Sequence, residues 1–184
     1  QNNRANSPCR TDCQKRIVVM GLYDKYILPE LVQLTCSNKR FREKRQAVLP
    51  LASGRVLEIG MGSGLNLPFY NQQNVDHIYG LEPSAQLRKK TQALAREISI
   101  PVELSANGAE DIPLNRQSVD TIVTTFTLCT ITDIEQALLE MRRVLKPDGI
   151  LIFCEHGRAP EHRIQRWQDR LNPLWKKIAG GCHL

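Results

Sequence analysis

A short apolar strand that runs into a glycine-rich turn constrains this chain more than any other feature. The segment RVLEIGMGSGLNL, residues 55–67, carries Gly60, Gly62 and Gly64 at alternate positions directly after its apolar residues. Glycine is the default residue where a backbone bends sharply or where a ligand approaches it closely. A buried strand, such a turn and a helix start together form a binding place for a cofactor. We therefore expect a cofactor at this turn.

Strands and helices alternate along the chain after this point. Apolar and β-branched runs predict the strands, and apolar residues at a helical period predict the helices. The strands are expected at 55–60, 77–82, 101–106, 119–126 and 150–155, and the helices at 85–98 and 133–145. Residues 146–149, Lys-Pro-Asp-Gly, are expected to stop the second helix. Apolar strands separated by helices indicate an α/β, Rossmann-like, doubly wound fold with a mainly parallel sheet.

Each predicted helix has one face that should pack on this sheet. The spacing of three and four residues along the chain defines these faces. The faces consist of Leu87, Thr91, Leu94, Ala95 and Ile98 in the first helix, and of Ile134, Ala137, Leu138, Met141 and Leu145 in the second.

The glycine spacing favours one class of nucleotide ligand over another. Dinucleotide-binding turns follow the pattern G-x-G-x-x-G, and here the third glycine of that pattern is replaced by Leu65. Glu58 precedes the first glycine by two residues, and its carboxylate suits a cationic ligand and would repel a pyrophosphate. Ligands of such sheets bind beyond the carboxyl ends of the strands, where Glu58 and Glu82 both stand.

These residues resemble the first motifs of class I S-adenosylmethionine-dependent methyltransferases. LEIGMGSG matches the family's acid-x-Gly-x-Gly-x-Gly pattern, and Glu82 matches the acid that binds both ribose hydroxyls. NGAEDIPL, residues 107–114, is similar to the segment that borders adenine, although Gly108 stands where the family usually has Asp. The resemblance implies S-adenosylmethionine as cofactor, S-adenosylhomocysteine as product and no metal. The implied cofactor-binding residues are Glu58, Gly60, Gly62, Gly64, Asn66, Glu82, Pro83, Ala109, Glu110 and Thr125.

Segments outside these motifs resemble one branch of that family, the methyltransferase-like thiol methyltransferases. They are YDKYILPEL near the start, TFTLCTI at 125–131, and the pattern E-H…W-Q…P-x-W-K…G-C-x-L at the end. The resemblance implies in-line methyl transfer to a small hydrophobic acceptor, an alkyl thiol. A base that favours the thiolate would assist this transfer, and Tyr23, Asp24 and His156 are candidates by position.

Other functions share the same donor motifs and stay open. A quinone-ring C-methyltransferase and a phospholipid N-methyltransferase would use every one of them, and a non-catalytic S-adenosylmethionine-binding module would bind the donor without turnover. A nucleic-acid partner is not expected, because TTFT stands after the fourth strand in place of an N/D-P-P-Y/F motif. The oligomeric state is open as well.

Charge and cysteine content bear on the surroundings of the protein. The net charge is +6, and the densest basic run, residues 37–46, is interpreted as the exposed face of a helix. The six cysteines form no C-x-x-C pair for a zinc site, and Cys129 and Cys154 lie in apolar stretches where a free thiol behaves as a small hydrophobe, so we expect a reducing cytoplasm. Apolar residues with a basic complement follow residue 156, a pattern that suits peripheral contact with a membrane.

The length of 184 residues is typical of one domain. We expect a flexible leader at 1–16 and a single methyltransferase domain at 17–184. This domain divides into an N-terminal helical cap at 17–50, a cofactor-binding core at 51–156 and C-terminal lid helices at 157–184. Sheets of the class normally have seven strands and this chain supplies five, so we expect the protein to continue beyond Leu184 or its tail to be disordered.

Overall fold

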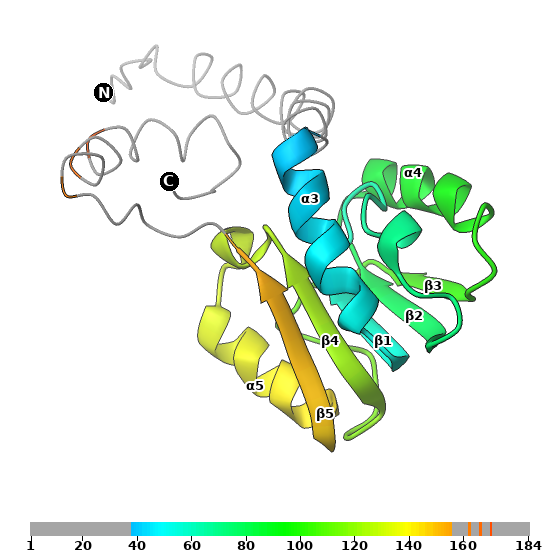
Figure 1. Cartoon of the computed structure of the whole chain (residues 1–184). Coiled ribbons are helices and arrows are strands. Elements are labelled where there is room, and N and C mark those ends of the chain that lie inside the picture. The colour runs from blue at the N-terminus through cyan, green and yellow to red at the C-terminus, as the bar shows by residue number, and fades with distance from the viewer. Residues whose placement is uncertain (1–37, 156–161, 163–165, 167–169, 171–184) are drawn as a thin grey trace, which may run out of the picture.

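The computed structural model describes residues 38–155 and the single positions 162, 166 and 170. Five strands form one sheet in the order β3-β2-β1-β4-β5, and all four neighbouring pairs are parallel (Figure 1). The strands are β1 (Gly54–Ile59), β2 (Val75–Leu81), β3 (Val102–Ser105), β4 (Val119–Thr125) and β5 (Leu145–Cys154). The strand order reverses between β1 and β4. The expected mainly parallel, Rossmann-like sheet is confirmed.

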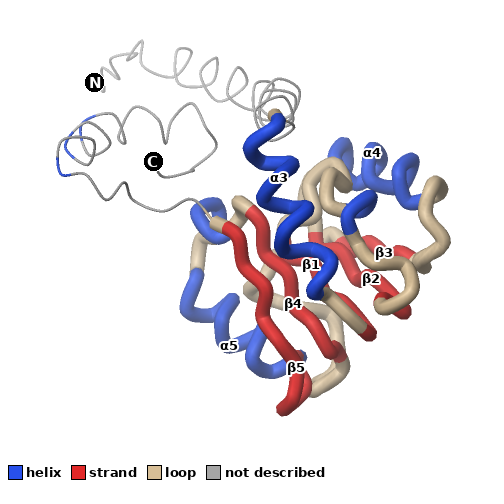
Figure 2. Tube along the Cα trace, in the orientation of Figure 1, coloured by secondary structure: helices blue, strands red, loops and turns tan. Residues whose placement is uncertain are grey.

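Three described helices cover this sheet, α3 (Lys39–Val48), α4 (Ala85–Ala95) and α5 (Ile134–Val144). Figure 2 shows α3 crossing in front of the sheet, while α5 lies behind β5. Side chains alternate along each strand, so Val56 joins the core on one face and Leu57 joins the core on the other. The first core includes partly buried residues of α3 and α4, and the second includes the buried residues of α5. The sheet is therefore covered on both faces.

Side-chain caps explain where the helices begin. Asn38, Ser84 and Asp133 each accept a hydrogen bond from a backbone N–H in the first turn of the helix that follows. Such caps satisfy N–H groups that have no partner within the helix. Helix α4 ends at Ala95, three residues before the end that the sequence predicts.

The expected inward face of α5 is only partly correct. Ala137, Met141 and Val144 are buried, whereas Ile134 and Leu138 are 38% and 47% exposed. Helix α5 packs beside β5, which is the edge strand of the described sheet, and no described element covers its outer side. A helix at an edge buries a narrower stripe than its apolar pattern suggests.

Residues 146–149 do not separate helix from strand as the sequence predicts. Helix α5 ends at Val144, and β5 begins at the next residue. The register between β4 and β5 shifts here, since Val119 pairs with Leu145 and Thr121 pairs with Ile150. The segment 146–149 is accommodated in this shift as an irregularity inside the strand, where Lys146 Nζ donates to Asp120 Oδ1 at 2.6 Å.

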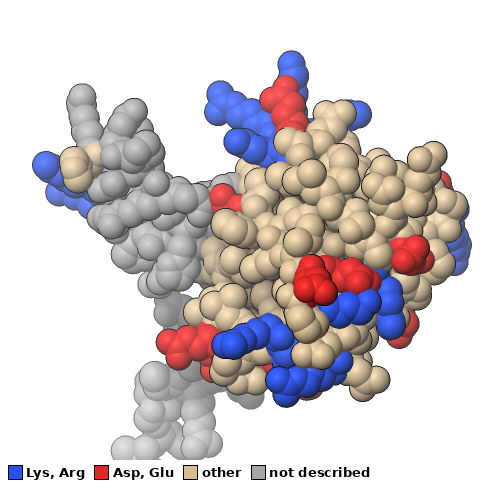
Figure 3. All heavy atoms as spheres, turned by 60° about the horizontal axis from the view of Figure 1, so that its bottom comes forward, with Lys and Arg blue, Asp and Glu red and all other residues tan. Residues whose placement is uncertain are grey.

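The face of the molecule drawn in Figure 3 carries both positive and negative side chains. Figure 3, which brings the bottom of Figure 1 forward, shows basic and acidic side chains side by side on that face. The basic run on α3 is not wholly exposed as expected, because Arg45 is only 5% exposed. In the described part of the chain, none of the helices has the length and apolar character needed to cross a membrane.

Candidate functional site

The three glycines after β1 all adopt the left-handed backbone region, with φ of +66° at Gly60, +60° at Gly62 and +81° at Gly64. A Cβ atom on Gly60 would lie 1.9 Å from Thr127 Oγ1, so only glycine lets the turn after β4 come this close. A Cβ atom on Gly62 would have no neighbour nearer than 4.0 Å. Gly62 therefore presents bare backbone to open space, where a ligand can approach.

Two adjacent hollows lie at the carboxyl ends of the strands and share Gly60, Thr127 and Thr130. The first has a volume of about 240 Å³ and the second about 180 Å³. The first is lined by Arg45, Gly60, Met61, Gly62, Ser63, Leu65, Asn66, Glu82, Leu87, Thr125, Phe126, Thr127 and Thr130. The second is lined by Ile59, Gly60, Leu81, Pro83, Asn107, Gly108, Ala109, Glu110, Thr127, Thr130, Ile131 and Thr132.

Most of the residues expected to bind the cofactor line these hollows. Gly60, Gly62, Asn66, Glu82 and Thr125 line the first, which we call the amino-acid hollow after one part of the expected cofactor. The second, which we call the adenine hollow after another part of it, is lined by the expected residues Pro83, Ala109 and Glu110, and by Gly60 again. Gly64 and Glu58 line neither hollow.

Glu82 lies directly after β2 and organises the glycine turn. Its Oε2 accepts from the Gly62 N–H at 2.9 Å, and its Oε1 accepts from the Ser84 N–H at 2.8 Å. The side chain is 8% exposed, and burial raises the pKa of its carboxyl, while the two backbone N–H groups lower it. A carboxylate oxygen accepts more than one hydrogen bond, so both oxygens keep capacity for the hydroxyls of a ribose.

Glu58 is held inside a buried hydrogen-bond network. Its Oε1 accepts from Asn66 Nδ2 at 2.8 Å and its Oε2 accepts from the Tyr70 hydroxyl at 2.7 Å. Asn66 in turn accepts from Arg45 Nε at 2.8 Å and donates to Thr125 Oγ1 at 3.0 Å. Burial raises the pKa of Glu58 to about 7, against the lowering effects of Tyr70, Asn66 and Arg45. Glu58 therefore acts on the amino-acid hollow through Asn66.

Glu110 fills the space left by the small residue at position 108. A Cβ atom on Gly108 would lie 2.6 Å from Glu110 Oε2. The other oxygen, Oε1, accepts from the N–H groups of Thr132 and Asp133 at 3.2 and 3.3 Å. The Glu110 carboxylate thus ties the loop after β3 to the start of α5 and closes one wall of the adenine hollow.

The turn after β4 contributes residues that the sequence did not single out. Phe126 has a φ of +56°, which is strained for a bulky residue, and its N–H donates to the Cys154 carbonyl at 2.9 Å. Glu155 Oε1 accepts from the N–H groups of Thr127 and Leu128. Strained backbone held by its surroundings is typical of functional sites, but no pattern in the sequence marks Phe126.

Arg45 was also missed, although its signal was present. Phe41, Arg45, Val48 and Leu49 have the i, i+4, i+7, i+8 spacing of one helix face. All four are at least partly buried. An arginine inside an apolar stripe is the sign that could have found it.

The remaining candidates are elsewhere. Tyr23, Asp24 and His156, proposed as bases, lie outside the described residues.

A hollow of about 700 Å³ is formed by α5 and the first half of β5, with Arg116, Gln117 and Lys146 among its lining residues. It lies at the amino ends of β4 and β5, away from the edge where such sheets bind ligands.

The fold and the two hollows define a Rossmann-like domain with a nucleoside-cofactor site at the carboxyl edge of its sheet. A family model described as a methyltransferase domain matches residues 57–153, which is more than half of the chain. The chain belongs to this family, that of the class I S-adenosylmethionine-dependent methyltransferases, whose cofactor is S-adenosylmethionine.

Two curated relatives with methyltransferase names agree with this assignment, and a solved structure shares the fold. The chain is 35% identical over 133 residues to the thiol S-methyltransferase TMT1B of Rattus norvegicus, an alignment covering 70% of this chain and 54% of that protein. It is 33% identical over 160 residues to the Homo sapiens TMT1B, covering 80% and 65%. The solved YcgJ protein of Bacillus subtilis is 26% identical with a TM-score of 0.56, covering 68% and 52%. The chain thus spans little more than half to two thirds of the length of these curated relatives.

Proposed function

We propose that this protein transfers the methyl group of S-adenosylmethionine to a small hydrophobic alkyl thiol. The observation that carries the donor assignment is the pair of hollows at one sheet edge, joined at Gly60 and flanked by the buried carboxylate of Glu82. The similarity to two thiol S-methyltransferases supports a thiol as the acceptor.

The residues present suit this donor. The bare backbone at Gly62 admits a ligand, and Glu82 offers carboxylate oxygens to ribose hydroxyls. Ala109 is buried and apolar beside the adenine hollow, as the face of an aromatic base requires. When bound, S-adenosylmethionine supplies a sulfonium methyl group, which forms a bond to the acceptor sulfur while its bond to the donor sulfur breaks. The protein's task is to align the two reactants and exclude water.

An apolar wall on the α3 side of the amino-acid hollow suits an alkyl acceptor. Phe126 lines this hollow, and Phe41 on α3 packs edge-on against it with ring centroids 4.6 Å apart. An alkyl chain gains free energy when it moves from water to such a surface. A thiol must lose its proton before or during transfer, and Tyr23, Asp24 and His156 remain the proposed candidates for a base.

Methyl transfer to a panel of acceptors tests this proposal. Donor carrying a labelled methyl group would be offered with an alkyl thiol, a reduced quinone ring or vesicles of phosphatidylethanolamine. We expect label in the thiol product, and a strong loss of that product in Glu82→Ala, which removes the carboxylate from the donor site. If only the quinone or only the lipid became labelled, that molecule and not the thiol would be the acceptor. Donor binding without any transfer would identify a non-catalytic binding module.

Three wider expectations belong to the same proposal. The acceptor is a small molecule rather than a nucleic acid, the protein works in the cytoplasm, and it contacts membranes peripherally. These rest on the sequence patterns given above, and the mixed charges in Figure 3 are compatible with a small-molecule acceptor.

A further inference from the structure

Thr125 is the last residue of β4, and it lines the amino-acid hollow. The residue is only 9% exposed, so its hydroxyl is largely shielded from water. Side chains alternate along the strand, so Thr125 shares a face with Val123, which belongs to the core on the α3 side. Thr124 lies on the other face with Ile122, in the core that α5 covers. A regular strand therefore holds the Thr125 hydroxyl in place beside the hollow.

The side-chain amide of Asn66 determines which way the Thr125 hydroxyl donates. Arg45 Nε donates to Asn66 Oδ1 at 2.8 Å, and a guanidinium has no acceptor, so the atom that faces it must be the amide oxygen. The amide nitrogen then donates one proton to Glu58 Oε1 at 2.8 Å and the other to Thr125 Oγ1 at 3.0 Å. Thr125 is therefore an acceptor toward Asn66, and its own proton has to point elsewhere.

The proton of the Thr125 hydroxyl has no acceptor among the residues that the structure describes. A buried donor that lacks an acceptor is costly, because the group has given up its hydrogen bonds to water. Since Thr125 lines the amino-acid hollow, an acceptor atom of a ligand in that hollow would remove this cost. The hollow thus favours a ligand with a hydrogen-bond acceptor beside the end of β4.

The strand order brings one part of the donor to this proton. Strand β1 lies between β2 and β4 (Figure 1), and two strand spacings separate the ends of β2 and β4 by about 10 Å. A donor whose ribose is bound at Glu82 therefore lies across the end of β1 and extends its amino-acid part toward Thr125. In that part the ammonium and the sulfonium have no hydrogen-bond acceptor, so the carboxylate is the group that can take the proton.

We propose that the Thr125 hydroxyl donates a hydrogen bond to the carboxylate of the donor's amino-acid part. This inference rests on the proposed function, because it assumes S-adenosylmethionine as donor. It assigns one proton of this chain to one group of the ligand. It also makes Asn66 a positioning residue, since the amide determines the direction of that proton. The site then discriminates against adenosyl compounds that lack the carboxylate.

A pair of ligands that differ only in the carboxylate tests the proposal. Calorimetry would measure the binding of S-adenosylhomocysteine and of its decarboxylated analogue to the wild-type chain and to Thr125→Val, which keeps the shape of the side chain and removes the hydroxyl. We expect the substitution to weaken S-adenosylhomocysteine about 10- to 100-fold, as the loss of a hydrogen bond to a charged group does, and the analogue less than about threefold. Thr125→Ser keeps the hydroxyl and should bind both ligands within about threefold of the wild type.

Thr124→Val is the matched control, because it makes the same change one residue earlier and on the other face of β4. Thr124 is fully buried, and its hydroxyl has no hydrogen-bond partner among the described residues. The control should leave both affinities unchanged. Thr125→Ala removes the hydroxyl together with the methyl group and should repeat the pattern of Thr125→Val.

The two ligands also separate the possible failures. Equal losses for both in Thr125→Val and Thr125→Ala, or no loss for either, would overturn the carboxylate contact while leaving the donor assignment intact. Wild-type protein that binds neither ligand would overturn the donor assignment as well.

Discussion

Glu58 and Glu82 are both buried carboxylates near the carboxyl edge of the sheet, but they have different surroundings. Glu82 lines the amino-acid hollow and accepts from two backbone N–H groups. Glu58 accepts from Asn66 and Tyr70 and lines no hollow. The two acids of the family motifs thus divide into one that lines the hollow and one that holds the residues around it.

The pKa of Glu58 predicts a loss of stability as the pH rises. Its carboxyl has a pKa of about 7 in the folded protein against an ordinary 4.5, so the folded state binds the proton more tightly. The protonated Glu58 therefore adds to the free energy of unfolding. This added stability is complete below pH 4.5 and is lost as the pH rises through about 7. From these two values we expect the free energy of unfolding to fall by about 2 kcal/mol between pH 5.5 and 8, relative to Glu58→Gln. Urea unfolding at the two pH values measures it.

Glu97→Gln is the control for this prediction, because Glu97 is an exposed carboxylate on the same domain. It should keep the pH dependence of the wild type. A wild-type chain and a Glu58→Gln chain with parallel pH profiles would contradict a proton held at Glu58.

Sequence reasoning at this scale located residues that belong to a local motif and missed those that depend on tertiary packing. Glu82 and Gly62 follow from spacing, because a turn and a strand end bring them together wherever this fold forms. Arg45 comes from a helix packed across the sheet, and only the apolar stripe that it shares with Phe41 and Leu49 distinguishes it from the exposed arginines of the basic run. Phe126 owes its backbone conformation to Cys154 on a neighbouring strand, which local sequence cannot show.

At the scale of elements, the glycine turn depends on contacts with two others. Thr91 on α4 donates to the Gly62 carbonyl at 2.8 Å, and Thr127 after β4 packs against Gly60. The turn after β4 is held in turn by Glu155 at the end of β5. The walls of the amino-acid hollow thus depend on contacts among the glycine turn, the turn after β4 and the residue that follows β5.

Alanine at two of the glycines should separate stability from binding. Both substitutions place an alanine at positive φ, which costs about 1–2 kcal/mol. Gly60→Ala adds a clash with the Thr127 side chain, so we expect it to destabilise the protein more than Gly62→Ala, by about 1–3 kcal/mol. Gly62→Ala should fold, yet bind S-adenosylhomocysteine at least about tenfold more weakly, because its methyl group enters the open space beside the loop.

Urea unfolding and calorimetry on the same two variants measure these effects. Equal losses of stability would argue against the contact with Thr127. Wild-type affinity in Gly62→Ala would show that the ligand does not approach the backbone there.

The inner strand β1 was predicted more closely than the start of the edge strand β5. Strand β1 is buried along most of its length, and a short buried apolar run between turns is typical of a strand in a parallel sheet. At the other extreme, the segment 146–149 looked like a turn between elements, and the structure places it inside β5. That placement depends on pairing with β4, including the Lys146–Asp120 contact, which spacing alone does not encode.

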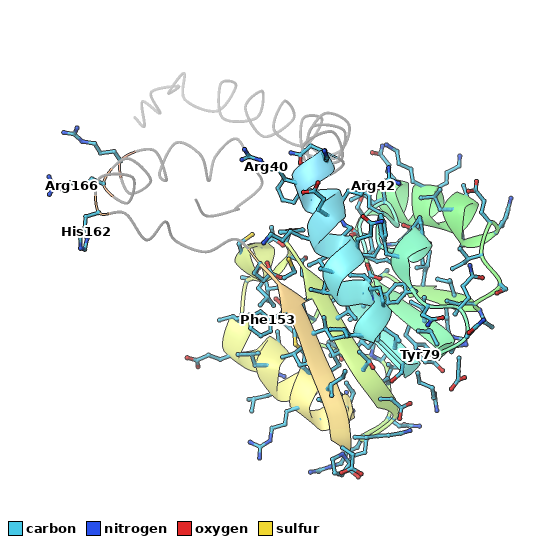
Figure 4. The ribbon with its side chains drawn as sticks, in the orientation of Figure 1. Arg40, Arg42, Tyr79, Phe153, His162 and Arg166 are labelled. Carbon is cyan, nitrogen blue, oxygen red and sulfur yellow. The ribbon has the colours of Figure 1, made fainter. Side chains whose placement is uncertain are left out.

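Over the whole molecule, apolar exposure is concentrated on one side. Six of the seven large exposed hydrophobic residues among the described ones belong to α5 and β5, and the seventh is Leu51. Phe153, labelled in Figure 4, is 65% exposed on the edge strand. The two hollows lie instead at the carboxyl ends of β1 and β2, which are inner strands of the sheet. The two hollows are therefore lined by residues from the middle of the sheet, and no exposed apolar residue of β5 lines either of them.

Because this site joins β1, β2, β4 and α3, ligand binding should stabilise the molecule as a whole. A ligand that binds the folded state alone adds about 2.7 kcal/mol at a concentration 100 times its dissociation constant. For a chain of this size that corresponds to a rise in melting temperature of about 5–10 °C. S-adenosylmethionine and S-adenosylhomocysteine should both produce this rise in a thermal unfolding experiment. NAD should not, because Leu65 stands where a dinucleotide-binding turn has its third glycine. A rise with NAD and none with either adenosyl compound would remove the basis for the donor site described above.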